Sequence, residues 1–374
     1  MKEVMTYKSG KFCFSDQYDI QTVNDLFVRA VVLNETIVDL PILPRLASQL
    51  EPDIMYSSIA GTAAIEGNPI TQEDVRKIAE GQDIEEYTIK DKQEIKNLIE
   101  AYKCLSDPSV VTEPFLLSED LIRDLHRKIT FDVPHERNTP GNYRNGRVEV
   151  GDKAHGGFYK PPKCLDDVAN LMREYVEWIN GREVMELHPL VRAPLAHYYF
   201  SAIHPFWDGN GRTARLIEAL ILQAGGVKYM PRELSNYYYR NVDSYYIAFS
   251  KTNKLKIDST PFVEFFLKAA VSSMEKIKKS IIYFIRVFSL RDYYILQNQS
   301  KEITKRQFEL LSLLLDYPTD FAFTLKDLTH KTPFKILYSK LSTQTARRDL
   351  AKLTEMDLLI FKENNYTLNF RVLG

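Results

Sequence analysis

The fold is decided by the stretch His204-Pro205-Phe206-Trp207-Asp208-Gly209-Asn210-Gly211-Arg212-Thr213-Ala214-Arg215. Pro205 disfavours the α conformation at His204, so the apolar pattern of Pro189–Ile203 predicts a helix that ends there and leaves the imidazole at its end. The pattern of Thr213–Ala224 predicts a second helix. The chain is therefore expected to turn between two helices at this stretch.

The predicted turn carries residue types that suit an anionic ligand. Gly209 and Gly211 let the backbone turn tightly and aim N–H groups at a ligand, and anions bind favourably at a helix start. Arg212 and Arg215 are three residues apart, so we expect both on one face of the first helical turn, where they fork onto phosphate oxygens. A lone histidine is more often a core residue than a base, but this combination favours a phosphate-handling site.

The stretch matches the pattern H-x-F-x-[DE]-G-N-G-R-x-x-R at every fixed position and resembles the signature of Fic-domain proteins. Ala214 stands where many relatives have glycine, which is a mild departure. The resemblance implies a mainly helical core and the transfer of AMP from ATP to a Ser, Thr or Tyr hydroxyl of a target protein. ATP is then a co-substrate, Mg²⁺ is a cofactor and pyrophosphate leaves.

The resemblance also implies a role for each motif residue. His204 is expected to act as the general base on the target hydroxyl, with a pKa near neutral. Asp208 is expected to hold Mg²⁺, because a hard cation prefers a carboxylate oxygen. The expected ATP contacts are Gly209, Asn210 and Gly211 near the α-phosphate, Arg212 at the β-phosphate and Arg215 at the γ-phosphate.

An upstream glutamate is a candidate inhibitor. Pro52 suits a first helical turn and Gly67 is a stop signal, so we predict a helix over 52–67 with Glu66 in its last turn. A carboxylate there opposes the helix macrodipole, and a nearby cation would relieve it. The alternative is an ordinary exposed glutamate.

The run from Thr62 to Gly67 resembles the pattern [ST]-x-x-x-E-[GN], which in Fic proteins supplies a glutamate to the second motif arginine, here Arg215. A guanidinium paired with Glu66 cannot also fork onto the γ-phosphate. The resemblance thus implies autoinhibition within one chain or through rearrangement of a homodimer, without a separate antitoxin.

Turn residues around a short alternating run in 141–151, and a second candidate strand ending at Tyr159, predict a β-hairpin. By resemblance this hairpin is a flap that docks the target peptide through strand addition. The expected docking edge consists of Val148, Glu149, Val150 and Gly151. An ordinary surface hairpin is the alternative.

Further along the chain, the resemblance points to Tyr245 and Asn253 as contacts of the adenine or ribose. Tyrosines at helical spacing are more often core residues than the wall of a cofactor site. A packing role for Tyr245 therefore stays open.

Composition limits the class of protein. The chain has 374 residues, 44% hydrophobic and 26% charged, which suffices for a globular core in two or three domains. The net charge of −1 argues against a positive electrostatic field over the whole protein that would attract nucleic acid. No apolar run is long enough to span a membrane. The N-terminus lacks an apolar signal core, and three isolated cysteines suit a reducing compartment, so we expect a cytoplasmic protein.

Helical patterns dominate the remainder, so the expected fold class is mainly α with a hairpin flap and a small winged helix-turn-helix domain. The expected domains are an N-terminal helical region over 1–110, a Fic catalytic domain over 111–290 and a winged-helix-like domain over 291–374. The helices are expected at 19–50, 71–106, 118–130, 164–180 and from Pro261 to about Ser289.

The last domain is expected to contain helices at 303–315, from Thr324 and from the cap Ser342, followed by a hairpin at 358–370. In a winged helix the third helix enters DNA. This region has a positive excess of only about three charges, so docking of a protein or a dimer contact is slightly favoured over DNA binding.

Two rival functions remain open at this stage. The chain could be a DNA-binding regulator whose Fic core senses nucleotide. It could also be a Fic enzyme with another reaction, either removing AMP from a modified protein or transferring another nucleotide or phosphocholine. The motif does not reveal the base of the nucleotide.

Overall fold

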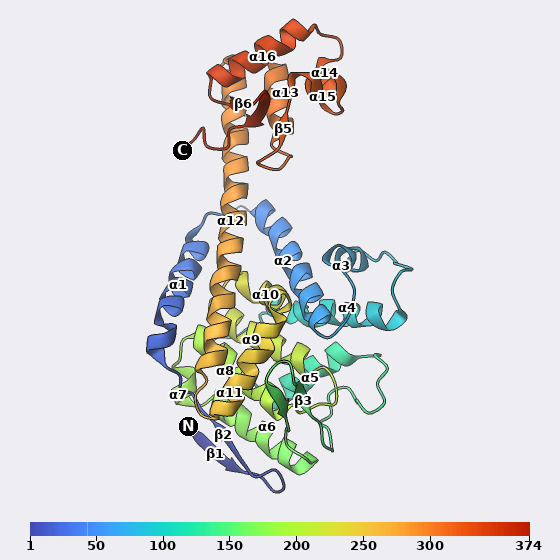
Figure 1. Cartoon of the computed structure of the whole chain (residues 1–374), viewed down its shortest axis with the longest axis vertical. Helices are drawn as coiled ribbons and strands as arrows, with labels where there is room; N and C mark the ends of the chain where they lie inside the picture. Colours follow the sequence, from blue (N-terminus) through green and yellow to red (C-terminus); the bar gives the residue numbers. More distant parts are fainter. Residues whose placement is uncertain (43) are drawn as a thin grey trace. The chain divides into compact units, whose positions relative to one another are not determined.

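Helices make up most of the protein, and the computed structural model describes residues 1–42 and 44–374. The strands form three small antiparallel sheets. Contacts divide the chain into two compact units, Met1–Lys278 and Lys279–Gly374 (Figure 1). Among the described residues no helix is both long and apolar enough to cross a bilayer. The mainly helical fold class is as expected.

The N-terminus forms a hairpin that the sequence analysis did not anticipate. Strand β1 (Lys2–Met5) pairs antiparallel with β2 (Lys11–Phe14), with Lys2 opposite Phe14. Phe14 is completely buried and packs against the ring of Trp178 at 5.5 Å between centroids. The hairpin is thereby fixed to the helical core.

The expected helix over 19–50 is wrong, because two helices occupy this region. Helix α1 (Ile20–Asp39) is capped by the Asp19 carboxylate and ends just before Pro41. Residue 43 of the expected helix lies outside the described part of the chain. Helix α2 (Pro44–Ile65) then begins at a proline, which suits a first turn.

The expected start of the second helix at Pro52 is also wrong, because Pro52 lies inside α2. Proline removes one backbone donor, and here the helix continues past it. Similarly, the expected helix over 71–106 is interrupted after Ala79, close to Gly81, whose φ is +81°. It consists of α3 (Gln72–Ala79), α4 (Ile89–Tyr102) and the short 3₁₀ helix η1 (Lys103–Ser106).

Two other helices begin and end within one residue of the prediction. Helix α5 (Glu119–Thr130) is capped by Ser118, whose hydroxyl accepts from the Leu121 N–H. Helix α6 (Leu165–Ile179) follows Cys164. Both have strongly amphipathic sequences, which explains why periodicity located them well.

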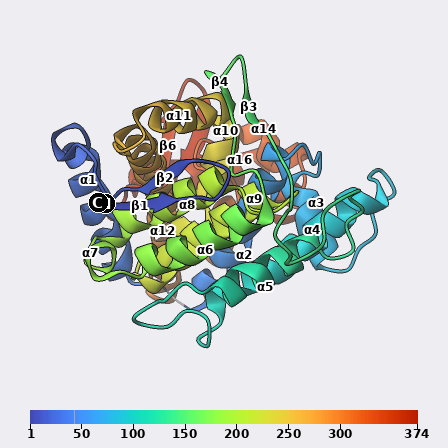
Figure 2. The ribbon, with the colours of Figure 1, turned by 90° about the horizontal axis from the view of Figure 1, so that it is seen from below.

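The centre of the first unit is the pair α8 (Pro189–Ile203) and α9 (Asn210–Ala224). Nearly every residue of both helices is buried. Helices α5 and α6 pack against them, as Figure 2 shows from below, and α2 also contacts α9. The remaining helices of this unit are α7 (Arg182–Met185), η2 (Met230–Arg232), α10 (Leu234–Arg240), α11 (Val242–Leu255) and the first part of α12 (Thr260–Gln299).

Helix α12 continues about ten residues beyond its expected end near Ser289, into the second unit. The rest of that unit runs α13 (Lys305–Leu314), β5 (Ala322–Phe323), α14 (Leu325–His330), α15 (Phe334–Tyr338), α16 (Thr343–Glu355), β6 (Leu359–Lys362) and β7 (Asn365–Leu368). Its sheet has the order β5-β7-β6. Ser342 caps α16 as expected, whereas α15 and β5 were not anticipated.

Candidate active site

The motif loop joins α8 to α9, and α8 ends at Ile203 as predicted. His204 has a left-handed backbone with φ 52°, and its N–H donates to the Phe200 carbonyl. Helix α9 begins at Asn210, three residues earlier than predicted, because Gly209 with φ +76° turns the chain sharply enough to start it there. Arg212 therefore lies in the first turn of α9, whereas Arg215 lies in the second.

Asn210 closes this loop with its side chain. Its amide oxygen accepts from the Phe206 N–H and its amide nitrogen donates to the Phe206 carbonyl, both at 2.9 Å. Phe206 is itself fully buried. The Asn210 side chain thus holds the loop conformation, and it does not line the cavity described below.

A cavity of about 320 Å³ lies beside the loop. Its walls bring together eight of the candidate residues that the sequence analysis named, together with other aromatic side chains of α11. These candidates are Glu66, Val150, Gly151, His204, Gly211, Arg215, Tyr245 and Asn253. Gly209, Asn210, Arg212 and Asp208 do not line it.

His204 is half-buried at the cavity wall. Burial lowers its pKa to about 4, and the charge of Arg144 nearby acts in the same direction. This pKa is lower than the near-neutral one expected from the sequence. The imidazole is accordingly uncharged at neutral pH, which is the form that accepts a proton.

Arg215 and Glu66 form an ion pair across the cavity wall. Nη2 of Arg215 donates to Oε1 of Glu66 at 2.7 Å, and the Nε donates to the Thr62 hydroxyl at 2.7 Å. The Arg215 side chain is 2% exposed, whereas that of Glu66 is 29% exposed. Glu66 lies just beyond the end of α2 at Ile65 and not in its last turn as expected, and its N–H donates to the Ala63 carbonyl of that turn.

Gly211 provides the space for this pair. A Cβ atom at that position would lie 2.4 Å from Oε1 of Glu66 and 3.1 Å from Nη1 of Arg215. The first separation is too short for a carbon atom unless the Glu66 carboxylate shifts, and the second is tighter than usual. A side chain at position 211 would therefore disturb the ion pair.

Asp208 in the motif loop and Arg212 in the first turn of α9 form a second ion pair. Nη2 of Arg212 donates to both carboxylate oxygens of Asp208, at 3.0 and 2.9 Å. Burial opposes ionisation of Asp208, but the charge of Arg212 and the hydrogen bonds from Gly209 and Arg212 together outweigh it, so the pKa of the carboxyl is lowered overall. Among the described residues, Nε and Nη1 of Arg212 are buried without a hydrogen-bond partner, although Glu94 lies 3.6 Å from Nη1.

The predicted hairpin consists of β3 (Val150–Asp152) and β4 (Gly157–Tyr159), with Val150 opposite Tyr159. The first strand begins later than expected. Of the predicted docking edge, only Val150 and Gly151 lie in β3, whereas Val148 and Glu149 precede it.

One segment of the chain matches a family of known proteins. Residues 116–222 match the Fic/DOC family. The chain contains a Fic domain. The match extends from just before α5 to Leu222 of α9, so the Fic domain includes the whole motif loop and the hairpin but neither Glu66 nor Tyr245.

The Fic domain is similar to those of protein adenylyltransferases. The chain is 30% identical over 219 residues to protein adenylyltransferase fic-1 of Caenorhabditis briggsae, which covers 58% of this chain and 39% of that protein. It is 31% identical over 188 residues to protein adenylyltransferase Fic of Drosophila mojavensis, covering 49% and 35%. The chain thus spans well under half the length of these relatives.

Solved structures share the fold around this Fic domain. A Fic family protein from Desulfovibrio desulfuricans G20 superposes with a TM-score of 0.59 at 21% identity, covering 95% of this chain and 98% of that one. Residues 134–508 of Fic-1 from C. elegans superpose with a TM-score of 0.56 at 23% identity, covering 69% and 72%. At these identities the similarity establishes the fold.

A buried side chain that fixes the motif loop of the Fic domain was missed by the sequence analysis. Arg144 has no solvent exposure and donates to the main-chain carbonyls of His204, Ile203, Gly146 and Pro162. Its own N–H donates to the Pro205 carbonyl. It thus replaces the hydrogen bonds that an irregular loop loses on burial, and no local sequence pattern marks such a residue.

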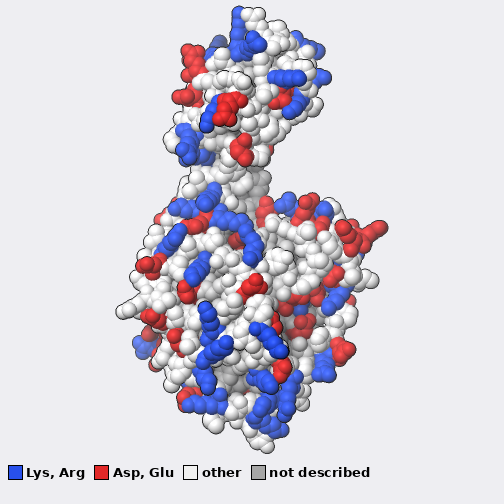
Figure 3. Space-filling model, in the orientation of Figure 1, with Lys and Arg blue, Asp and Glu red and all other residues white. Residues whose placement is uncertain are grey.

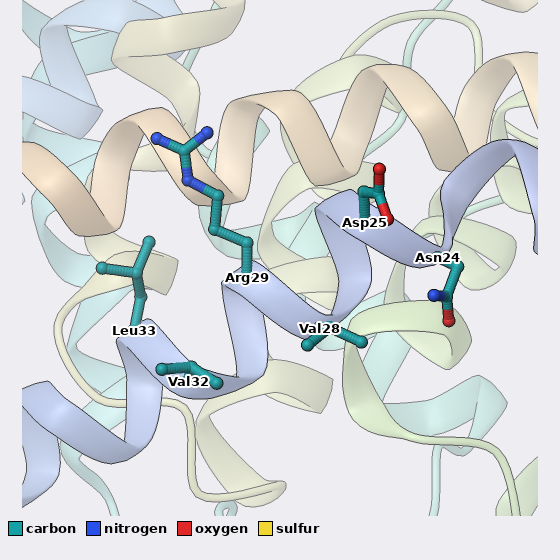
Figure 4. A pocket seen from close by; sticks show the side chains of 6 residues that line it. All are labelled: Asn24, Asp25, Val28, Arg29, Val32 and Leu33. Carbon is teal, nitrogen blue, oxygen red and sulfur yellow. The ribbon is translucent and has the colours of Figure 1, made fainter.

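A second hollow lies on the surface of α1, outside the Fic match. Figure 4 shows its lining along one helix, with the Arg29 side chain extending away from Val28 and Val32. It contains none of the candidate residues. The cavity beside His204 is therefore the candidate active site.

Proposed function

We propose that the chain is a protein adenylyltransferase that transfers AMP from ATP to a hydroxyl side chain of a target protein. The observation that carries the proposal is the joint presence of an uncharged imidazole, His204, and a buried guanidinium, Arg215, on the wall of one cavity. The first can accept a proton and the second can bind a phosphate. The names of the similar proteins support the same reaction.

In the proposed reaction, the target hydroxyl oxygen attacks the α-phosphorus of ATP. Its proton passes to the free ring nitrogen of His204, and the bond from the α-phosphorus to the bridging oxygen breaks so that pyrophosphate leaves. Reactions of this type need mainly positioning and charge stabilisation from the protein. The N–H groups at the start of α9 and the guanidinium of Arg215 provide both for the phosphates.

Arg212 and Asp208 are suited to bind the other charged groups of this reaction, the β-phosphate and Mg²⁺. The buried Nε and Nη1 of Arg212, unpartnered among the described residues, are donors to which a β-phosphate can bind. Asp208 would hold Mg²⁺, since its carboxylate side chain is 30% exposed and Mg²⁺ commonly takes one carboxylate plus phosphate oxygens. Bound Mg²⁺ would neutralise charge on the phosphates.

The ion pair of Glu66 with Arg215 supports autoinhibition. In the present geometry the carboxylate occupies Nη2 of Arg215, so a γ-phosphate could reach that donor only after Glu66 moves away. Glu66 is the more exposed partner and lies outside any helix, so it is the group that moves. The activity of the unmodified chain is thus expected to be low.

One experiment tests both parts of this proposal. Wild type, Glu66→Gly and Glu66→Gly/His204→Ala are incubated with ATP labelled on the α-phosphate and a cell extract, and modified proteins are identified by mass spectrometry. A hydrogen bond between charged groups stabilises by about 1.5–3 kcal/mol, so Glu66→Gly should raise transfer about tenfold or more. Adding His204→Ala should abolish the transfer.

Other nucleoside triphosphates labelled in the same way serve as controls for the base. Persistent transfer in the variant without His204 would remove the imidazole from the mechanism. An unchanged rate in Glu66→Gly would contradict autoinhibition and leave the transferase proposal intact.

A further inference from the structure

A chain of buried polar side chains lies behind Arg215, and neither the motif nor the proposed reaction uses it. It consists of Glu218 on α9, His197 on α8 and Tyr245 on α11, which are 1%, 0% and 2% exposed. Polar groups that are this buried need hydrogen-bond partners to offset their desolvation. Their partners lead from the protein core to the active site.

The contacts follow one another without a gap. Nδ1 of His197 lies 2.6 Å from Oε2 of Glu218, and Nε2 lies 2.9 Å from the Tyr245 hydroxyl oxygen. That oxygen in turn accepts from Nη1 of Arg215 at 3.4 Å. These hydrogen bonds therefore connect the buried carboxylate of Glu218 to the guanidinium of Arg215 on the cavity wall.

The directions of these hydrogen bonds are mutually determined. The Glu218 carboxylate only accepts, so Nδ1 of His197 carries a hydrogen and donates to it. If Nε2 also carried one, it would donate to Tyr245, and the Tyr245 hydroxyl hydrogen would have only donors around it. Among the described residues, the arrangement in which every hydrogen meets an acceptor has Tyr245 donating to Nε2 of His197 and accepting from Arg215.

We propose that Glu218, His197 and Tyr245 are positioning residues that hold the guanidinium of Arg215 in the orientation required to bind the terminal phosphate of a nucleoside triphosphate. This inference rests on the proposed function. The hydroxyls of Thr62 and Tyr245 accept from Nε and Nη1 of Arg215, so the guanidinium stays fixed. Its Nη2 can then replace the Glu66 carboxylate with a phosphate as hydrogen-bond acceptor. Exchange then needs movement of Glu66 alone.

A packing role would account for the ring of Tyr245 but not for its hydroxyl. The ring stacks on Tyr238 with centroids 5.1 Å apart and an interplanar angle of 16°, within an aromatic cluster that includes Phe249. Phenylalanine would satisfy these ring contacts equally well. Removal of the hydroxyl alone therefore separates positioning from packing.

The test measures dissociation constants of ATP and ADP by titration calorimetry, in a Glu66→Gly background so that Arg215 is free. ADP lacks the phosphate that Arg215 is proposed to bind. Since the Tyr245 hydroxyl accepts a hydrogen bond from the charged Arg215, Tyr245→Phe should weaken binding of ATP about tenfold, while binding of ADP changes less than about twofold. Glu218→Gln, which does not line the cavity, should weaken ATP selectively but less.

Tyr238→Phe is the matched control. Tyr238 is equally buried and donates to the other oxygen of Glu218 at 2.8 Å, but its hydroxyl does not contact Arg215. We expect this variant to leave the ratio of the two dissociation constants within about twofold of the parent. Retained ADP binding shows in each case that the variant is folded.

If Tyr245→Phe and Glu218→Gln each weaken the binding of ATP and of ADP equally, the positioning role is overturned. It is also overturned if Tyr238→Phe changes the ratio of the two dissociation constants as much as Tyr245→Phe does. Transfer assays on the parent Glu66→Gly protein distinguish this result from failure of the proposed function. If the ratio changes as expected but no AMP is transferred to protein, the positioning role stands and the transferase proposal fails. If AMP is transferred but the ratio is unchanged, the positioning role fails alone.

Discussion

His126 shows how a single side chain outside the motif holds the motif loop. Its ring lies flat on Phe206 with centroids 3.6 Å apart, and its Nδ1 accepts from the Gly141 N–H at 2.9 Å. Nε2 therefore carries the hydrogen and donates to the Asp208 carbonyl at 2.9 Å. One neutral imidazole thus joins α5, the loop before the hairpin and the motif.

This contact predicts a pH dependence of stability. Burial lowers the pKa of His126 from 6.5 to about 4, so between these values the unfolded chain binds a proton that the folded chain does not. The free energy of unfolding should therefore fall as the pH decreases from about 6.5 towards 4, and change little from this source above it. Denaturant titrations at several pH values of wild type and His126→Gln measure the effect.

The His126→Gln variant should show a shallower decrease, with a remainder from His204, whose pKa is lowered in the same direction. Identical pH dependences in the two proteins would exclude His126 as a source.

Single residues differ in how far the sequence determines their role. The contact of Glu66 with Arg215 was expected from the resemblance of two short patterns to those of Fic proteins, although the residues lie far apart in the chain. Arg144, His126 and His197 could not be recognised, because each is defined by carbonyls or carboxylates contributed by other elements. Asn210 was recognised, but the contact that its amide makes within the loop was not.

At the scale of elements, strong amphipathic periodicity located α5 and α6, and the proline rule located the end of α8. Periodicity failed where two helices follow one another, as in α1 and α2 or α3 and α4, because an apolar pattern does not reveal a short break. It also missed β1 and β2, which are stabilised by packing of Phe14 on α6 and α8 and not by a local pattern.

The packing of α2 on α10 makes a prediction about Gly61. This glycine lies inside α2, where alanine would favour the helix by up to about 1 kcal/mol. A Cβ atom here would, however, lie 2.8 Å from the backbone of Asn236 on α10, and overpacking costs about 1–3 kcal/mol. We expect Gly61→Ala to lower the thermal midpoint by several degrees. A midpoint that stays the same or rises would show that the two helices can separate at little cost.

At the scale of the whole molecule, the two units differ in charge as well as in contacts. Residues 1–278 contain 34 Lys and Arg against 40 Asp and Glu, whereas residues 279–374 contain 15 against 10. Both signs are interspersed on the face shown in Figure 3. The net charge of the whole chain is therefore near zero because an acidic unit and a basic unit nearly cancel.

The second unit is expected to fold by itself. Its core is formed by residues from α12 to β7 alone, among them Leu290, Tyr294, Leu310, Leu350 and Leu359, all 0–1% exposed. Asp349 ties α16 to Arg306, Gln307 and Tyr338 inside the same unit. A protein consisting of residues 279–374 should show helical circular dichroism and one cooperative thermal transition. A disordered spectrum would mean that its stability comes from the first unit.

The position of the two tryptophans provides the protein with an optical reporter. Trp178 is nearly enclosed by Phe14 and Tyr199, so its emission should be insensitive to events in the cavity. Trp207 belongs to the motif loop itself, lies against Gly146 and has the guanidinium of Arg137 over its ring at 5.3 Å. Nucleotide-dependent shifts in intrinsic fluorescence can therefore be attributed to one indole, and the occupancy of the loop can be followed in real time without a dye.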